Sequence, residues 1–145
     1  MCGEIVNMNK NSKKMKILVI DDKKEITEEI SEFFQVLDYE IVATNDSMIG
    51  LNFIRHDNFD LILLDIDMPV ISGLGIIELL SREDNLKNQN IFVFPDNYIT
   101  QTQLDSLLKR EGIKGFLKKP INFDELLAIT TLVTGKKIHN TDITN

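Results

Sequence analysis

Five short apolar runs, each followed by a segment with helical periodicity, constrain the fold more than any other feature of the sequence. The runs read KILVI from Lys16, YEIVAT from Tyr39, DLILLD from Asp60, NIFVF from Asn90 and KGFLK from Lys114. Short runs of this kind, rich in β-branched residues, are typical of strands buried on both faces. Five strand–helix units joined by short loops predict an α/β fold, with a doubly wound parallel sheet, right-handed crossovers and helices on both faces.

The segments between the runs have the spacing of amphipathic helices. After the first run, apolar residues recur at intervals of four, three and four: Ile26, Ile30, Phe33 and Leu37. Asp46 or Ser47 is predicted to cap the second helix, and Gly112 to be the C′ residue of the fourth. The third, fourth and fifth helices are predicted over residues 75–82, 101–110 and 123–133, with Gly73 near the start of the third.

Composition and chain ends narrow the classes of function. Residues 1–14 predict a disordered lead and residues 135–145 a polar tail, which leaves one folded domain over 15–134. The net charge of -7 argues against direct, non-specific nucleic-acid binding. No apolar run reaches the roughly 18 residues that span a membrane, and the N-terminus lacks the pattern of a signal peptide. The lone Cys2 excludes an internal disulfide, and a cytoplasmic protein is expected.

Charged residues follow three of the five runs. Asp21 and Asp22 come directly after KILVI, Asp65 ends DLILLD, and Lys119 with Pro120 follows KGFLK. Functional groups of a doubly wound sheet gather at the carboxyl ends of its strands. We therefore expect three acids and one lysine, from three separate segments, to converge on one edge.

Each of these residues also has a structural explanation when it is taken alone. Asp22 and Glu25 match a capping box, Asp65 could begin a turn before Pro69, and Lys119 could simply be solvated. Taken together they are harder to explain, because two carboxylates about 4 Å apart repel by roughly 4 kcal/mol at an effective dielectric near 20. A hard divalent cation with oxygen ligands relieves that repulsion, and the cluster predicts a Mg2+ site.

The order and spacing of these residues resemble the receiver domain of bacterial two-component response regulators. The match comprises the Asp pair after ILVI, Asp65 followed by Met68-Pro69 and Gly73, and the Lys-Pro pair after GFLK. It covers residues 15–134, and the combination is specific although each piece is weak alone. The resemblance implies a flavodoxin-like sheet of strand order 2-1-3-4-5.

The resemblance also implies a role for each site residue. Asp65 would accept the phosphoryl group, and Lys119 would pair with that group. The Lys119-Pro120 peptide would be cis. Mg2+ would be bound directly by Asp22 and Asp65, by Asp21 through water, and by Asp67 through its backbone carbonyl.

The implied function is a phosphorelay signalling step rather than enzymatic turnover. A sensor histidine kinase or a histidine phosphotransfer protein would supply the phosphoryl group, and an unknown downstream protein would read the result. Because no DNA-binding domain follows, a stand-alone receiver is expected. The sequence identifies neither the kinase nor the target nor the phosphoryl lifetime, and it leaves open a homodimer formed on phosphorylation.

One position departs from the family pattern. Receivers usually carry Thr or Ser after the fourth strand, where the hydroxyl bonds to the phosphoryl group. Here strand register places Pro95 at that position, and the usual helix length would place Asn97 there. Neither has a hydroxyl, although the coupled aromatic residue of the fifth strand matches as Phe116. This departure favours an alternative, a receiver-like interaction module that works without phosphorylation, or a receiver whose conformational response is altered.

A second alternative comes from the segment DIDMPV, which begins at Asp65. It resembles the haloacid-dehalogenase phosphatase signature D-x-D-x-[TV], in which the two acids are nucleophile and general acid. Met68-Pro69 replaces the rest of that signature, and the acidic pair lies 43 residues upstream of Asp65 instead of downstream. The order of the motifs therefore disfavours a phosphatase.

Overall fold

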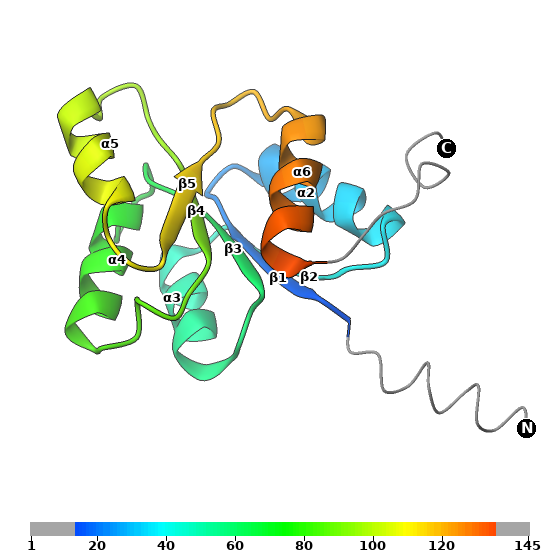
Figure 1. Cartoon of the computed structure of the whole chain (residues 1–145), viewed down its shortest axis with the longest axis horizontal. Helices are drawn as coiled ribbons and strands as arrows, with labels where there is room; N and C mark the ends of the chain where they lie inside the picture. The colour runs from blue at the N-terminus through cyan, green and yellow to red at the C-terminus, as the bar shows by residue number, and fades with distance from the viewer. Residues whose placement is uncertain (1–13, 136–145) are drawn as a thin grey trace, which may run out of the picture.

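All five predicted strands form, and they pair in parallel in the order β2-β1-β3-β4-β5. The computed structural model describes residues 14–135 (Figure 1). The strands are β1 (Lys16–Ile20), β2 (Glu40–Thr44), β3 (Leu61–Asp65), β4 (Ile91–Phe94) and β5 (Ile113–Phe116). The predicted flavodoxin-like, doubly wound fold is confirmed. The predicted lead and tail lie outside the described residues except for Lys14 and Gly135.

Helices cover both faces of the sheet. They are α2 (Lys24–Val36), α3 (Ser47–His56), α4 (Gly73–Arg82), α5 (Gln101–Leu108) and α6 (Phe123–Thr134). Helices α2 and α6 lie on one face and α3, α4 and α5 on the other (Figure 1). Within residues 14–135, no helix has the length and apolar character needed to cross a membrane.

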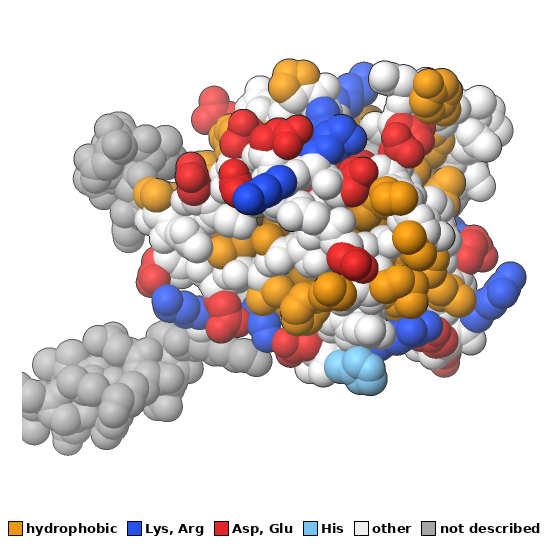
Figure 2. All heavy atoms as spheres, turned by 180° about the vertical axis from the view of Figure 1, so that it is seen from behind, with side chains coloured by type: hydrophobic (Ala, Val, Ile, Leu, Met, Phe, Trp, Pro, Cys, Tyr) orange, Lys and Arg blue, Asp and Glu red, His pale blue; other side chains and the backbone are white. Residues whose placement is uncertain are grey.

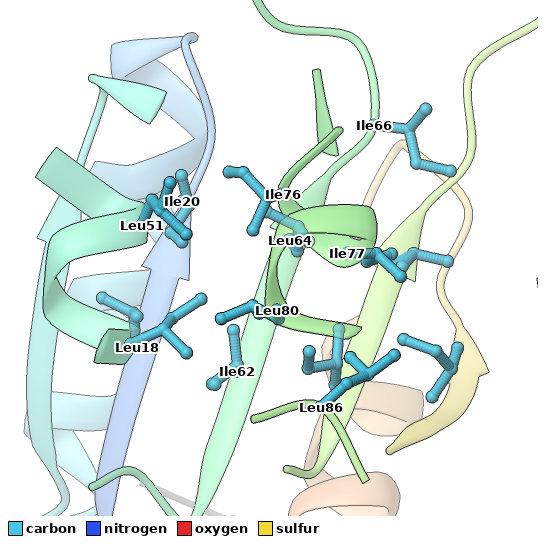
Figure 3. Close-up of a cluster of buried hydrophobic side chains, with 14 of the residues drawn as sticks. Leu18, Ile20, Leu51, Ile62, Leu64, Ile66, Ile76, Ile77, Leu80 and Leu86 are labelled. Carbon is cyan, nitrogen blue, oxygen red and sulfur yellow. The ribbon is translucent and has the colours of Figure 1, made fainter. Parts of the chain in front are cut away.

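Successive residues of the central strands face opposite helical layers. Ile17 and Val19 of β1 pack into the cluster that includes Phe34 of α2, whereas Leu18 and Ile20 pack into the cluster against α3 and α4 (Figure 3). Every residue of β3 is buried, as expected for a strand covered on both faces. This two-sided burial explains why β1, β3 and β4 read as continuous apolar runs, whereas the edge strands β2 and β5 are only partly buried.

Of the two aspartates that match helix-capping patterns in the sequence, only one caps a helix. Asp46 caps α3, accepting hydrogen bonds from the backbone N–H groups of Met48 and Ile49 at 2.9 and 3.1 Å. The capping box that Asp22 and Glu25 match in the sequence does not form, because the N-cap of α2 is Lys23, which makes no side-chain cap bond. The carboxylate of Asp22 is therefore not used to cap the helix.

Gly112 has a different role from the one predicted. Helix α5 ends at Leu108 with Lys109 as its C-cap, so Gly112 is not the C′ residue. It lies just before β5 with φ of +96°, and a Cβ at this position would overlap the carbonyl oxygen of Leu86. Glycine is required here by the turn into the edge strand and by close packing against a loop, and not by helix termination.

Gly73 brings the start of α4 against the end of β3. Its N–H donates to the carbonyl of Ile66 at 2.9 Å, and a Cβ on Gly73 would overlap the carbonyl oxygen of Asp65 and lie 2.8 Å from the Cα of Ile66. The absence of a side chain therefore lets a helix pack directly on the backbone that carries Asp65.

We expect Gly73→Ala to destabilise the fold by about 1–3 kcal/mol, because the added methyl group must displace the backbone of β3 or α4. Gly75→Ala is the matched control on the same helix, since the nearest heavy atom to its added Cβ would be Ser72 Oγ at 3.5 Å. The control should be neutral or stabilise the protein by up to about 1 kcal/mol. Urea unfolding of the two variants measures the difference, and equal free energies of unfolding would contradict the steric argument.

Candidate metal centre

The register of the sheet brings Asp21 and Asp65 to the same edge. Strands β1 and β3 are neighbours, and Ile20 pairs with Leu64, so the next residue on each strand reaches the same carboxyl end. One carboxylate oxygen from each of Asp21, Asp22 and Asp65 lies within 4.8 Å of the others. Asp21 and Asp65 are buried, and Asp22 is half-buried. The three acids from two separate segments thus form one cluster.

Hydrogen bonds from neighbouring loops fix the first of these acids. Asp21 Oδ1 accepts from the backbone N–H of Lys23 at 2.9 Å, and the N–H of Asp21 donates to the carbonyl of Thr44 at 3.2 Å. The amide of Asn45 donates to the carbonyl of Asp21 at 2.8 Å and to the hydroxyl of Thr27 at 3.0 Å. The orientation of this carboxylate is therefore set by the backbone and by a side chain from the β2–α3 loop.

Three buried carboxylate oxygens accept no hydrogen bond: Asp21 Oδ2, Asp22 Oδ1 and Asp65 Oδ2. Buried polar atoms are nearly always satisfied, and a buried charge without partners costs more than a neutral group. Oxygen atoms of this kind, converging from separate carboxylates, are the ligands that Mg2+ prefers. The residues present therefore fit a small divalent cation.

Lys119 approaches the same cluster from the segment after β5. Its Nζ lies 2.6 Å from Asp21 Oδ2, an ion pair without regular hydrogen-bond geometry, and 3.5 Å from Asp65 Oδ1. The ammonium also lies 5.4 Å from the centre of the Phe94 ring. The Lys119-Pro120 peptide is cis, as predicted. Lys119 thus bridges acids from β1 and β3 across the edge of the sheet.

The environment of Asp65 raises its pKa from 3.8 to about 7. The main cause is burial, which penalises the charged form, and the charge of Asp21 adds to it. Lys119 and a backbone hydrogen bond from Asp67 act in the opposite direction, while the charge of Asp22 raises the pKa further. A cation bound at the cluster would reverse this balance and favour the ionised carboxylate.

A cavity of about 470 Å³ opens over Asp65. Pro95 and Asn97 both line it, and Pro95 follows Phe94, the residue that pairs with Asp65. Neither provides a hydroxyl group. Asp67, the fourth predicted ligand, also lines the cavity but is exposed. Its carboxylate does not belong to the cluster of Asp21, Asp22 and Asp65, and the prediction gave it a role only through its backbone carbonyl.

Two residues that sequence reasoning missed belong to the site. Lys23 lines the cavity and lies next to the acid cluster, and Asn45 holds the backbone of Asp21. The position of Lys23 directly after the acidic pair was a usable signal, because its backbone has to remain at the same edge. Nothing in the sequence marks Asn45, since it lies 24 residues from the group it contacts.

Comparison with known proteins agrees with this geometry. A family model described as the response regulator receiver domain matches residues 17–131. The chain belongs to this family.

Particular relatives extend the comparison. Over 128 residues the chain is 30% identical to the CAI-1 autoinducer sensor kinase/phosphatase CqsS of Vibrio cholerae, covering 88% of this chain and 18% of that protein. It is 33% identical over 120 residues to the transcriptional regulatory protein DltR of Streptococcus agalactiae, covering 83% of this chain and 52% of that protein. The chain thus spans about half or less of these curated relatives.

A solved structure of similar size carries the metal. The response regulator protein TrrA from Thermotoga maritima, in complex with Mg2+-BeF, matches with a TM-score of 0.68 and 29% identity. The match covers 82% of this chain and 98% of that one. Receiver domains of this family therefore include Mg2+-bound structures, and the cluster of Asp21, Asp22 and Asp65 is compatible with such a site.

We expect Asp65→Asn to stabilise the metal-free protein, and the gain to grow as the pH rises. The folded-state pKa of Asp65 is about 7, above an unfolded value near 3.9, so the folded protein binds more protons between these values. The contribution of the Asp65 carboxyl to the free energy of unfolding of the wild type therefore falls as the pH rises from about 4 to 7. The asparagine variant has no such loss, and its advantage should reach about 2 kcal/mol or more at pH 8, since one pKa unit corresponds to about 1.4 kcal/mol.

Thermal unfolding in EDTA at pH 5 and pH 8 measures this difference. Glu32→Gln, which removes one negative charge at an exposed position of α2, is the control for net charge. An equal gain for Asp65→Asn at both pH values would contradict the assignment.

Proposed function

We propose that this receiver domain accepts a phosphoryl group on Asp65 with the help of Mg2+. The ion would be held directly by the carboxylates of Asp22 and Asp65, through water by Asp21, and by the backbone carbonyl of Asp67. The observation that carries the proposal is the cluster of Asp21, Asp22 and Asp65, in which one oxygen of each carboxylate lies within 4.8 Å of the others and each acid has a buried oxygen that accepts no hydrogen bond. Lys119 lies beside the cluster. A protein-interaction module that is not phosphorylated would not need three mutually repelling carboxylates in one cluster.

The chemistry follows from the placement of these groups. A carboxylate oxygen of Asp65 attacks the phosphorus of a phosphohistidine or a small acyl or amido phosphate, forming an O–P bond as the bond to the donor breaks in line. The leaving group keeps the bonding electrons: a nitrogen leaving group carries or takes up a proton from solvent, whereas an acyl donor leaves as a carboxylate. Lys119 pairs with a phosphoryl oxygen and neutralises part of its charge. When bound, Mg2+ supplies further positive charge to the phosphoryl oxygens.

The proposed partners follow from the family and from the surface. A sensor histidine kinase or histidine phosphotransfer protein in the cytoplasm would supply the phosphoryl group, and the domain would act as a signalling component and not as a turnover enzyme. Hydrophobic side chains gather on the face shown in Figure 2. Exposed apolar side chains of the described residues include Met48 and Ile49 on α3, and Val70 and Leu74 on either side of the start of α4. Surface patches of this kind are typical of protein–protein contact.

One observation keeps the phosphorylation-independent module as a second candidate. Pro95 and Asn97 line the cavity where the family usually provides a hydroxyl, and Pro95 lacks a backbone donor as well. Phosphoryl capture depends on the acids and Lys119, whereas the response of the β4–α5 loop depends on a donor at this position. The two properties are therefore separable in this chain.

Incubation with phosphoramidate and Mg2+ should add the mass of one phosphoryl group to the protein. Asp65→Asn should abolish the gain, because no carboxylate is left to form the anhydride. EDTA should reduce it strongly. Asp67→Asn is the matched control two residues away, and it should keep the gain because its predicted contribution is through the backbone. A wild-type protein that gains no mass would favour the phosphorylation-independent module.

A separate prediction concerns the response to phosphorylation. With beryllofluoride and Mg2+, amide chemical shifts should change around Asp65 and Lys119 but remain nearly constant at Phe116, because no hydroxyl draws the β4–α5 loop inward. The measurement compares amide spectra of the wild type and of Asp65→Asn, which should not respond. A large change at Phe116 in the wild type would show that another donor, such as the amide of Asn97, replaces the hydroxyl.

A further inference from the structure

Lys23 occupies a position that the rules of helix capping disfavour. It is the N-cap of α2, with φ of -93° and ψ of 114°, and its side chain makes no cap hydrogen bond. Ser, Thr, Asp and Asn are the favoured residues at an N-cap, and a positive charge is unfavourable near the positive end of the helix dipole. A residue that breaks a local rule in this way calls for a compensating interaction.

The acid cluster provides that interaction. Lys23 Nζ lies 3.6 Å from Asp22 Oδ1, a buried oxygen that accepts no hydrogen bond. The charge of Asp22 is the main cause that raises the pKa of Lys23, burial opposes it, and Asp65 and Asp21 add to the rise. The backbone N–H of Lys23 is bonded to Asp21, so the base of the side chain is fixed while its end remains half exposed.

The two lysines of the site differ in how firmly they are held. Lys119 is 26% exposed and bridges Asp21 and Asp65, at 2.6 and 3.5 Å. Lys23 is 50% exposed and contacts only the more accessible acid, Asp22, at a longer distance. Lys23 also lines the cavity over Asp65, and its side chain is long and flexible, so the ammonium can leave Asp22 without leaving the site.

We propose that Lys23 is a displaceable counter-cation of the metal centre, which neutralises Asp22 in the metal-free protein and gives way when Mg2+ binds there. The inference rests on the proposed function, because it concerns the same Mg2+ site. Its consequence is regulatory: Mg2+ has to compete with a tethered ammonium group, so Lys23 raises the Mg2+ concentration at which the centre fills. Lys23 is a positioning residue here and not a catalytic one.

The test is calorimetric titration of the full chain with MgCl2, without any phosphodonor. Lys23→Gln should bind Mg2+ about fivefold more tightly than the wild type. This is the order of effect expected when a partly exposed ion pair, here between Lys23 and Asp22, no longer competes with Mg2+ for the carboxylate. Lys23→Arg keeps the charge and should stay close to the wild type. Lys118→Gln is the matched control, because Lys118 also lines the cavity but has no ion pair with the acids, and its Mg2+ affinity should change less than twofold.

A second readout uses the metal-free protein. In EDTA, Lys23→Gln should unfold at a lower temperature than Lys118→Gln, because Asp22 loses its counter-charge. Unchanged or weaker Mg2+ binding by Lys23→Gln, an equal gain in Lys118→Gln, or a gain in Lys23→Arg would each overturn the inference. Failure of all proteins to bind Mg2+ would overturn it together with the metal centre, whereas Mg2+ binding without phosphoryl gain would refute only the proposed function.

Discussion

The parallel pairing of β1 with β3 is the constraint on which the rest of this structure depends. It carries Asp21 and Asp65 to one edge and buries both, so the fold has to hold negative charges where water cannot stabilise them. The surrounding groups are arranged to limit that cost. Lys119 reaches across from the segment after β5, and the backbone N–H of Lys23 donates to Asp21 Oδ1. One buried oxygen on each of the three acids still accepts no hydrogen bond. Fold stability and cation binding are therefore coupled through the same few carboxylates.

The strands could be predicted because they depend on short-range patterns, the convergence of the acids because it follows from a parallel sheet, and the strand order because of the resemblance to receiver domains. Buried parallel strands give continuous apolar runs, and the carboxyl edge follows from the topology. Asp46 as a cap was also readable, since capping is local. The capping-box match at Asp22 shows the limit of local reasoning, because the motif alone does not distinguish a helix cap from a member of a charge cluster that forms only in the folded state.

Other features depended on contacts between distant segments. Gly112 looked like a helix terminator because the helical pattern ran close to it, but the glycine is required by the carbonyl of Leu86, which lies 26 residues earlier. Asn45 was missed as a site residue for a similar reason, because a polar residue next to a strand is common and only the fold shows that its amide meets the backbone of Asp21. Lys23 was missed although its position beside the acidic pair was a usable signal.

The bare backbone at Gly73 determines which parts of the site are stiff. Helix α4 lies directly on the carbonyl of Asp65, so the acceptor strand and the first helical turn form one closely packed unit with little freedom to deform. The β4–α5 loop is more open, since Pro95 is half-buried and Asn97 is exposed, and it is held by hydrogen bonds from the backbone N–H groups of Tyr98 and Ile99 to Asp96. Any rearrangement that accompanies a change of charge on Asp65 is therefore expected in the β4–α5 loop, while the wall formed by the end of β3 and the start of α4 stays in place.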